Sequence, residues 1–283
     1  MKSPSLIFIL MLTLVAGSAA QKQPSSGSAP QTVKAPPQAK TQAEFKDYNV
    51  AYATTGGSQM EAAANAFAAK YPDSELRVYL YNKAMHEYQT ENNPEKILAM
   101  SEKVLTLDPD NTISLVMTAT VLSDQLSDTT PDPEKIAVIK KNAARALETV
   151  ETMAPVAGAT PQQNAAYKDT LRVMAHSALG ITSLKSGDNA AAEQELKAAT
   201  NAGQAPPDAY VWYHLALAQD HQKKYTEALA SVEQALHYIG SNAELGKLAA
   251  GERDRLRQLT GTAVLPSPNA GPQAQPSPAP PPL

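Results

Sequence analysis

The chain has 283 residues, of which 43% are hydrophobic and 5% aromatic, with a formal net charge of −4 and no cysteine. The lack of cysteine excludes disulfides, thiolate nucleophiles, Cys-ligated metal sites and the lipid anchor of bacterial lipoproteins. A nucleic-acid-binding protein would need a basic face, which this acidic balance disfavours.

Residues 1–20 have the three parts of a secretory signal peptide. Lys2 gives the positive start, Leu6 to Ala16 form an apolar run, and Gly17 to Ala20 are small residues that suit cleavage after Ala20. The alternative is a membrane anchor, but the apolar run covers only about half of the roughly 20 residues that span a bilayer. We therefore predict an exported chain, periplasmic or secreted, without stable membrane insertion after cleavage.

Two segments outside the predicted body are poor in residues that can be buried. Residues 21–42 are rich in Pro, Ser, Ala and Gln, which predicts a disordered linker. Residues 261–283 end in PSPNAGPQAQPSPAPPPL and predict a disordered tail with polyproline II character. This tail is either a ligand for a Pro-binding module or, the interpretation we favour, a solvated tail. The folded body is predicted at residues 43–260.

The body contains an internal period. Ala51, Met85 and Ala119 are spaced 34 residues apart, Gly180 follows after 61, and Ala216 follows after another 36. Each of these positions lies in a predicted helix that is followed, after a polar turn, by a second helix. A small residue at this point lets two antiparallel helices approach closely, and Met85 departs from that pattern.

The first two predicted helix pairs have recognisable turns and ends. Gly56-Gly57 form the turn of the first pair. In the second pair, Asn93-Pro94 start the second helix, with Pro at the first helical position. Pro109 then ends that helix, and either Asp110 or Asn111 caps the next one.

The third pair is stretched. Its first helix is predicted at Ile113–Ser123 and its second at about 134–151, beginning at Asp132-Pro133. A long loop follows, and Thr160-Pro161 then start an extended helix that reaches about Lys185. The 27 residues in excess of the 34-residue period are either a spacer between two stacks of repeats or a binding site.

The last two pairs are the most regular, and their pattern resembles the tetratricopeptide repeat (TPR). Leu179-Gly180 precede an SGDN turn and an Ala-rich helix, and Trp212, Leu215 and Ala216 precede a helix that contains Ala228. In that family, a large residue, a Leu and a small residue of the first helix meet an Ala of the second. The phrase AFAAKYPDSELR near the first pair resembles exported, cell-envelope repeat proteins of bacteria.

The resemblance implies an all-α fold, an antiparallel helix-pair (TPR-like) solenoid of about eleven helices, with disordered N- and C-terminal segments. A helix after Ser241 is predicted to cover the exposed end of the stack. The predicted units are residues 44–77, 78–111, 112–172 with the insertion, 173–208 and 209–241, followed by a capping helix at 242–260.

Motifs of catalysis are absent from the sequence. We find no Gly-rich phosphate loop, no His-Glu-x-x-His and no Gly-x-Ser-x-Gly. His214 and His221 are seven residues apart, so a metal site would need a further ligand such as His176. Glu193 and Glu195 are interpreted as part of a solvated helix face. We therefore predict no enzyme, no cofactor and no metal.

The remaining candidate site is the concave surface that the first helices of such a stack form. Aromatic side chains there suit capture of a partner protein or peptide, because rigid rings bury area at low entropic cost. The alternatives are that these rings pack between repeats, or that the groove binds cell-wall glycan or a small ligand. The candidate residues are Phe45, Tyr48, Tyr52, Tyr79, Asn82, His86, Tyr210, Tyr213, His214 and Asp220.

Overall fold

The computed structural model describes residues 37–156, 158–203 and 208–261. The predicted signal peptide, most of the predicted linker and nearly all of the predicted tail lie outside these ranges. Within them the chain forms eleven α-helices and no strand, as an all-α solenoid requires. No helix of the described part is long and apolar enough to cross a membrane.

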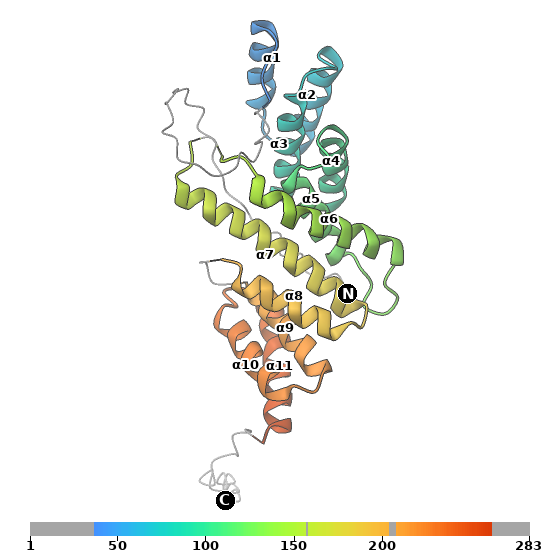
Figure 1. Ribbon diagram of the computed structural model, residues 1–283, viewed down its shortest axis with the longest axis vertical. Helices are drawn as coiled ribbons and strands as arrows, with labels where there is room; N and C mark the ends of the chain where they lie inside the picture. The colour runs from blue at the N-terminus through green and yellow to red at the C-terminus, as the bar shows by residue number, and fades with distance from the viewer. Residues whose placement is uncertain (1–36, 157, 204–207, 262–283) are drawn as a thin grey trace, which may run out of the picture.

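Consecutive helices pack against each other along the chain, so that α1 and α11 lie at opposite ends of an elongated stack (Figure 1). The odd-numbered helices α1 to α9 are the first members of five antiparallel pairs, and α11 closes the stack. The helices are α1 Gln42–Tyr52, α2 Gly57–Lys70, α3 Arg77–Thr90, α4 Pro94–Leu107, α5 Thr112–Asp124, α6 Pro133–Thr152, α7 Pro161–Lys185, α8 Asn189–Asn201, α9 Ala209–His221, α10 Tyr225–His237 and α11 Ala243–Leu259.

Helix starts follow the local chemistry of the sequence. The side chains of Asn93, Asp132 and Thr160 each accept a hydrogen bond from a backbone N–H in the first turn of α4, α6 and α7, and Pro occupies the first turn of all three helices. Of the two candidates for the cap of α5, the structure selects Asn111, whose Oδ1 accepts from Ser114 N at 3.2 Å. These caps confirm the predicted boundaries of the helices.

The close approach of paired helices is set by residues sixteen positions apart. Gly180 of α7 faces Leu196 of α8, and a Cβ on Gly180 would lie 2.5 Å from Leu196 Cγ. Met85 of α3 is the large member of its pair, and Ser101 of α4 is the small one: Ser101 Oγ donates to Met85 Sδ at 2.9 Å. Both Met85 and Ser101 are buried. The departure at Met85 is therefore accommodated because its partner on the second helix is small.

The turn inside three of the pairs repeats a backbone conformation. Asn92, Gly187 and Lys223 have φ angles of 53°, 81° and 61°. Each residue lies seven positions after the close-approach residue of its first helix. This left-handed residue lets the chain reverse between the two helices of a pair.

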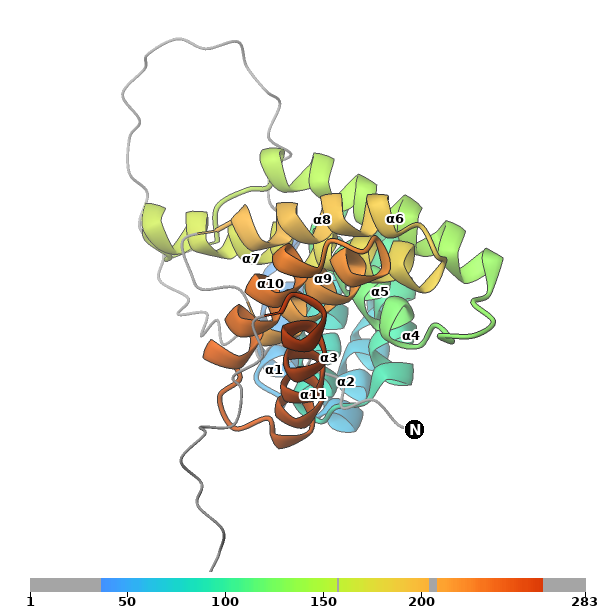
Figure 2. The ribbon, with the colours of Figure 1, turned by 90° about the horizontal axis from the view of Figure 1, so that it is seen from below.

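The excess residues of the stretched unit lengthen two helices, α6 of the third pair and α7 of the fourth pair. The helix α6 has 20 residues and α7 has 25, whereas the other helices of the five pairs have 11 to 14. Figure 2 shows α6, α7 and α8 side by side along one flank of the molecule. Because α7 also packs against α5, the excess residues join the two halves of the stack.

The interpretation of Glu193 as part of a solvated helix face is wrong. Its side chain is 8% exposed, and its carboxylate accepts hydrogen bonds from Lys197 and Gln222. The carboxylate also accepts one from Lys224 at the start of α10. Glu195, in contrast, is half-buried and lies 2.8 Å from His176 Nδ1. The burial of Glu193 could not be predicted from the local sequence, because two of its three partners, Gln222 and Lys224, come from the next repeat.

Burial by itself raises the pKa of the Glu193 carboxyl, but the hydrogen bonds from Lys197, Lys224 and Gln222 lower it to about 2. A carboxyl with a lowered pKa stabilises the fold above the pKa of the unfolded chain, about 4.3, and that contribution is lost as the pH falls toward 2. We predict that Glu193→Gln lowers the free energy of unfolding at pH 7 by on the order of 2 kcal/mol. The difference from the unmodified chain should shrink between pH 5 and pH 2 in urea unfolding.

The matched control for this experiment is Glu227→Gln, which changes an exposed carboxyl of α10. It should leave stability nearly unchanged across the same pH range. A deficit of Glu193→Gln that persists undiminished at pH 2 would contradict the assignment.

A second prediction concerns the close approach of α7 and α8. We expect Gly180→Ala to lower the free energy of unfolding by about 1–3 kcal/mol, because the added methyl group overpacks against Leu196. The control is Gly251→Ala in α11, where a Cβ would meet nothing within 4 Å. That change should be neutral or stabilising, since Ala favours a helix over Gly. Equal effects of the two substitutions in thermal unfolding would contradict this account.

Candidate functional site

Four of the predicted site residues come together at one end of the stack. Phe45 and Tyr48 of α1 and Tyr79 of α3 line an open groove of about 570 Å³, and the rings of Tyr48 and Tyr52 are 5.5 Å apart. One wall is formed by residues 37–42, and Leu76 also lines the groove. We call this surface the tyrosine groove: Phe45, Tyr48, Leu76, Tyr79 and the wall at residues 37–42, together with Tyr52, which packs beside Tyr48.

The rings of the tyrosine groove both pack and remain accessible. Tyr48, Tyr52 and Tyr79 are half-buried and lie against the core of α1 to α4, with the Tyr48 ring 6.2 Å from Phe67 in an edge-on contact. Phe45, in contrast, is 57% exposed. Tyr48 and Tyr79 therefore pack against the core and also line the groove, whereas Tyr52 packs against the core beside Tyr48.

The hydroxyl groups distinguish the groove tyrosines from their neighbours. Within the described part of the chain, no hydrogen-bond partner is found for the hydroxyls of Tyr48, Tyr52 and Tyr79. Elsewhere in the same half of the molecule, Tyr71 donates to Asp47 and Tyr88 donates to Glu61, each at 2.6 Å. The groove thus offers hydroxyl donors and acceptors that the fold does not use.

These hydroxyls stay protonated. Burial raises the pKa of Tyr48, Tyr52 and Tyr79 above the ordinary value near 10. A phenol that resists ionisation remains a neutral hydrogen-bond donor at any physiological pH. The groove therefore offers hydroxyl donors that can bond an acceptor such as a carbonyl oxygen.

Asn82 and His86 lie on the same helix as Tyr79, and their side chains already have partners. Asn82 Oδ1 accepts from Ser114 Oγ at 3.3 Å, and His86 Nδ1 lies 3.4 Å from Gln89 Oε1. The nearby Lys83 donates to Thr54 O at 2.7 Å and to Glu87 at 2.6 Å, and its Nζ is 5.8 Å from the Tyr52 ring centroid. These polar groups brace α3 against its neighbours.

The other predicted site residues form a second group on α9. The rings of Tyr210 and His214 are 4.1 Å apart, and the Tyr213 ring is 5.7 Å from His214. Burial lowers the pKa of His214 to about 4, so the ring is neutral at pH 7 and Nδ1–H donates to Tyr210 O at 2.8 Å. Because α9 packs against α7, α8 and α10, this group is separate from the tyrosine groove.

Asp220 does not face outward as a free carboxylate. Its Oδ1 lies 2.5 Å from Arg255 Nη2, so it forms an ion pair with the closing helix α11. Asp220 of α9 therefore joins the last pair to the closing helix α11. This ion pair forms only when α11 is folded against the pair.

A cluster that sequence analysis missed surrounds Tyr210. Lys185, at the end of α7, donates to Ser123 O at 3.2 Å and to Leu126 O at 3.0 Å, which satisfies carbonyls at the end of α5. It also pairs with Asp128 at 3.5 Å. Burial raises the pKa of the adjacent Asp124 to about 6, against the opposing charge of Lys185. No local motif could reveal this cluster, because its members are about 60 residues apart.

The histidines are dispersed. His176 contacts Glu195, and His221 Nδ1 lies 3.1 Å from Asn189 Oδ1. Across residues 37–156, 158–203 and 208–261, no group of three or more His, Asp or Glu side chains is close enough to hold a metal ion.

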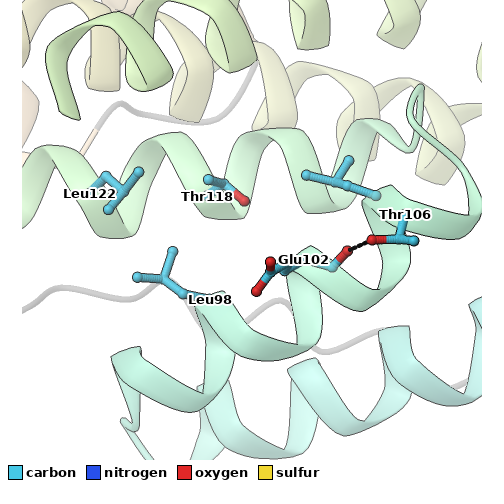
Figure 3. A pocket seen from close by; sticks show the side chains of 6 residues that line it. Leu98, Glu102, Thr106, Thr118 and Leu122 are labelled. Atoms are coloured by element: carbon cyan, nitrogen blue, oxygen red, sulfur yellow. Dashed lines mark hydrogen bonds between the residues drawn. The ribbon is translucent and has the colours of Figure 1, made fainter. Parts of the chain in front are cut away.

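A second groove, of about 470 Å³, lies between α4 and α5. Figure 3 shows Leu98 of α4 and Leu122 and Thr118 of α5 lining it from opposite sides. Glu102 and Thr106 lie at its rim, and Thr106 Oγ1 donates to Glu102 O at 2.8 Å. This groove has no aromatic lining.

A third prediction compares the loss of a tyrosine hydroxyl without a partner among the described residues, at Tyr48, with the loss of a bonded one, at Tyr88. We expect Tyr48→Phe to change the free energy of unfolding by less than about 0.5 kcal/mol, because the lost hydroxyl has no partner in the described fold. Tyr88→Phe should cost about 1–3 kcal/mol, because it removes the hydrogen bond to the Glu61 carboxylate. Urea unfolding of both variants measures the difference. A loss at Tyr48 as large as that at Tyr88 would show that Tyr48 has a structural hydrogen bond.

No protein-family model and no curated protein matches the chain. A solved structure that is similar is a thermophilic TPR protein from Thermus thermophilus, with 15% sequence identity and a TM-score of 0.39. The similarity covers 74% of this chain and 98% of that chain. The helix-pair fold and the groove described above stand on the helices and contacts of this chain alone.

Proposed function

We propose that the chain is a non-enzymatic scaffold of the cell envelope or secreted space, which holds an extended segment of a partner protein in the tyrosine groove. The observation that supports the proposal is the set of hydroxyls on Tyr48, Tyr52 and Tyr79, for which the described residues supply no partner. The rings of Tyr48 and Tyr79 line an open groove of about 570 Å³, within the range of about 300–1,000 Å³ that is typical of ligand clefts, and the Tyr52 ring packs beside Tyr48.

The chemistry of the groove suits a peptide backbone. A carbonyl oxygen of a bound segment accepts from a neutral phenol, and the ring beneath it buries apolar area without freezing many torsions. The rings are already held against the core of α1 to α4, so little order has to be imposed on binding. The helix pairs thus present a pre-organised surface.

The second aromatic group on α9 is proposed as an accessory contact. Tyr210 and Tyr213 are half-buried, and within the described residues their hydroxyls have no hydrogen-bond partner either. Asp220 is excluded from this role because Arg255 already pairs with it. Export through residues 1–20 belongs to the proposal, because it would place the scaffold among envelope or secreted partners.

The test is a triple variant, Tyr48→Ala, Tyr52→Ala and Tyr79→Ala. A photo-crosslinking residue at Phe45 reports what occupies the groove. Truncating groove aromatics typically costs more than about 1.4 kcal/mol in total, which is tenfold in affinity. We therefore expect the crosslinked partner to be lost, as seen by mass spectrometry of crosslinked envelope extract.

The matched control replaces three exposed hydrophobic residues outside the groove, with Val50→Ala, Val138→Ala and Tyr238→Ala. It should retain the crosslinked partner. Capture that survives the triple tyrosine variant would overturn the proposal. Binding to purified peptidoglycan, lost in the same variant and without a protein partner, would show that the groove takes glycan.

A further inference from the structure

The tyrosine groove is matched to an uncharged ligand. Its wall contains Lys40, whose Nζ donates to Asp73 O at 2.8 Å and whose backbone N–H donates to Glu44. Lys83, next to the Tyr52 ring, is held by Thr54 O and Glu87. Both lysines therefore already donate hydrogen bonds within the described fold, and Lys40 is the only charged side chain among the described residues that line the groove.

This combination favours a proline-rich segment over other peptides. A polyproline II helix has a fully solvated backbone whose carbonyl oxygens project outward, and proline has no N–H that would demand an acceptor. Its rigid rings dock in grooves lined by aromatic side chains, at low entropic cost. The hydroxyls of Tyr48 and Tyr79, for which the described residues supply no partner, match these carbonyls.

The chain itself contains such a segment. Residues 262–283 include eight prolines and no charged side chain, and residues 276–282 read PSPAPPP. This stretch offers neutral carbonyl acceptors for the hydroxyls of the groove and apolar ring surface for its aromatic rings.

Building on the proposed function, we propose that the tyrosine groove of one copy binds residues 276–282 of a second copy. The contact is heterologous: it joins the end of one solenoid that carries α1 to a segment that follows α11 of another. Such contacts build closed rings or open chains rather than symmetric dimers.

The reach of the segment favours a second copy over the same molecule. The helices α1 and α3, which carry the groove, and α11, which the segment follows, lie toward opposite ends of the stack (Figure 1). Between them are four to five steps of helix packing at about 8–10 Å each, on the order of 40 Å or more. Residues 262–275 would cover about 43 Å at the polyproline II rise of about 3.1 Å per residue. Binding within one molecule would need this stretch to run straight, which makes its effective concentration low.

The first experiment measures binding of the segment. A fluorescent peptide of residues 262–283 is titrated into the chain from residue 21 that carries Pro→Ala changes at Pro276, Pro278, Pro280, Pro281 and Pro282, so that its own segment does not compete. We expect saturable fluorescence anisotropy, with affinity at least tenfold weaker after Tyr48→Phe and Tyr79→Phe. These two changes remove hydroxyls that the described fold does not use, and the variant is expected to fold. Tyr238→Phe, outside the groove, should bind as before.

The second experiment measures association. In sedimentation velocity, the chain with its prolines intact should show a weight-average mass that rises with concentration, and the variant with five Pro→Ala changes should not. A peptide that does not bind, or that binds equally to the Tyr48→Phe, Tyr79→Phe variant, overturns the proposal. Peptide binding without association of the intact chain overturns the assignment to a second copy.

The two proposals fail separately. If the segment does not bind but the groove crosslinks to another protein in a tyrosine-dependent manner, the proposed function stands and this inference falls. If neither binding is observed, both fall.

Discussion

The close approach of two antiparallel helices is the constraint on which the structure depends. At one position of each regular pair the side chains on the two helices share a fixed volume, so that a large residue on one helix demands a small one on the other. In one pair the small residue is on the first helix, with Gly180 facing Leu196. In another it is on the second helix, with Ser101 facing Met85. Because each pair is fixed in this manner, the first helices are held at defined positions, and the side chains on them become a defined surface.

The repeats are joined by polar contacts that satisfy buried groups across pair boundaries. Glu193 of α8 is bonded by Lys224 of the next pair, Lys185 of α7 closes the end of α5, and Asp220 of α9 pairs with Arg255 of α11. Buried charges are tolerated only when they are paired in this way. These contacts make the stack one unit, with the long helices α6 and α7 joining its two halves.

The tyrosine groove depends on this rigidity. Its rings are anchored in the core of α1 to α4, while the hydroxyls of Tyr48, Tyr52 and Tyr79 have no partner among the described residues. Neutral hydroxyl donors beside exposed ring surface suit a ligand that supplies hydrogen-bond acceptors. The proposed capture of an extended segment, and of the chain's own proline-rich residues in particular, follows from that chemistry rather than from the repeat architecture.

The sequence by itself predicted about eleven helices, the caps of α4, α6 and α7 and the internal period, because helix starts depend on residues a few places apart. Asn93, Asp132 and Thr160 show this directly. Only the tertiary structure decided the roles of Glu193, Lys185 and Asp220, because partners of each lie about 30 to 60 residues away, and Glu193 is buried and bonded rather than solvated. The same reason separates the predicted site residues into a groove on α1 and α3 and a second group on α9, since periodicity assigns a face to a helix but not the neighbours that cover it.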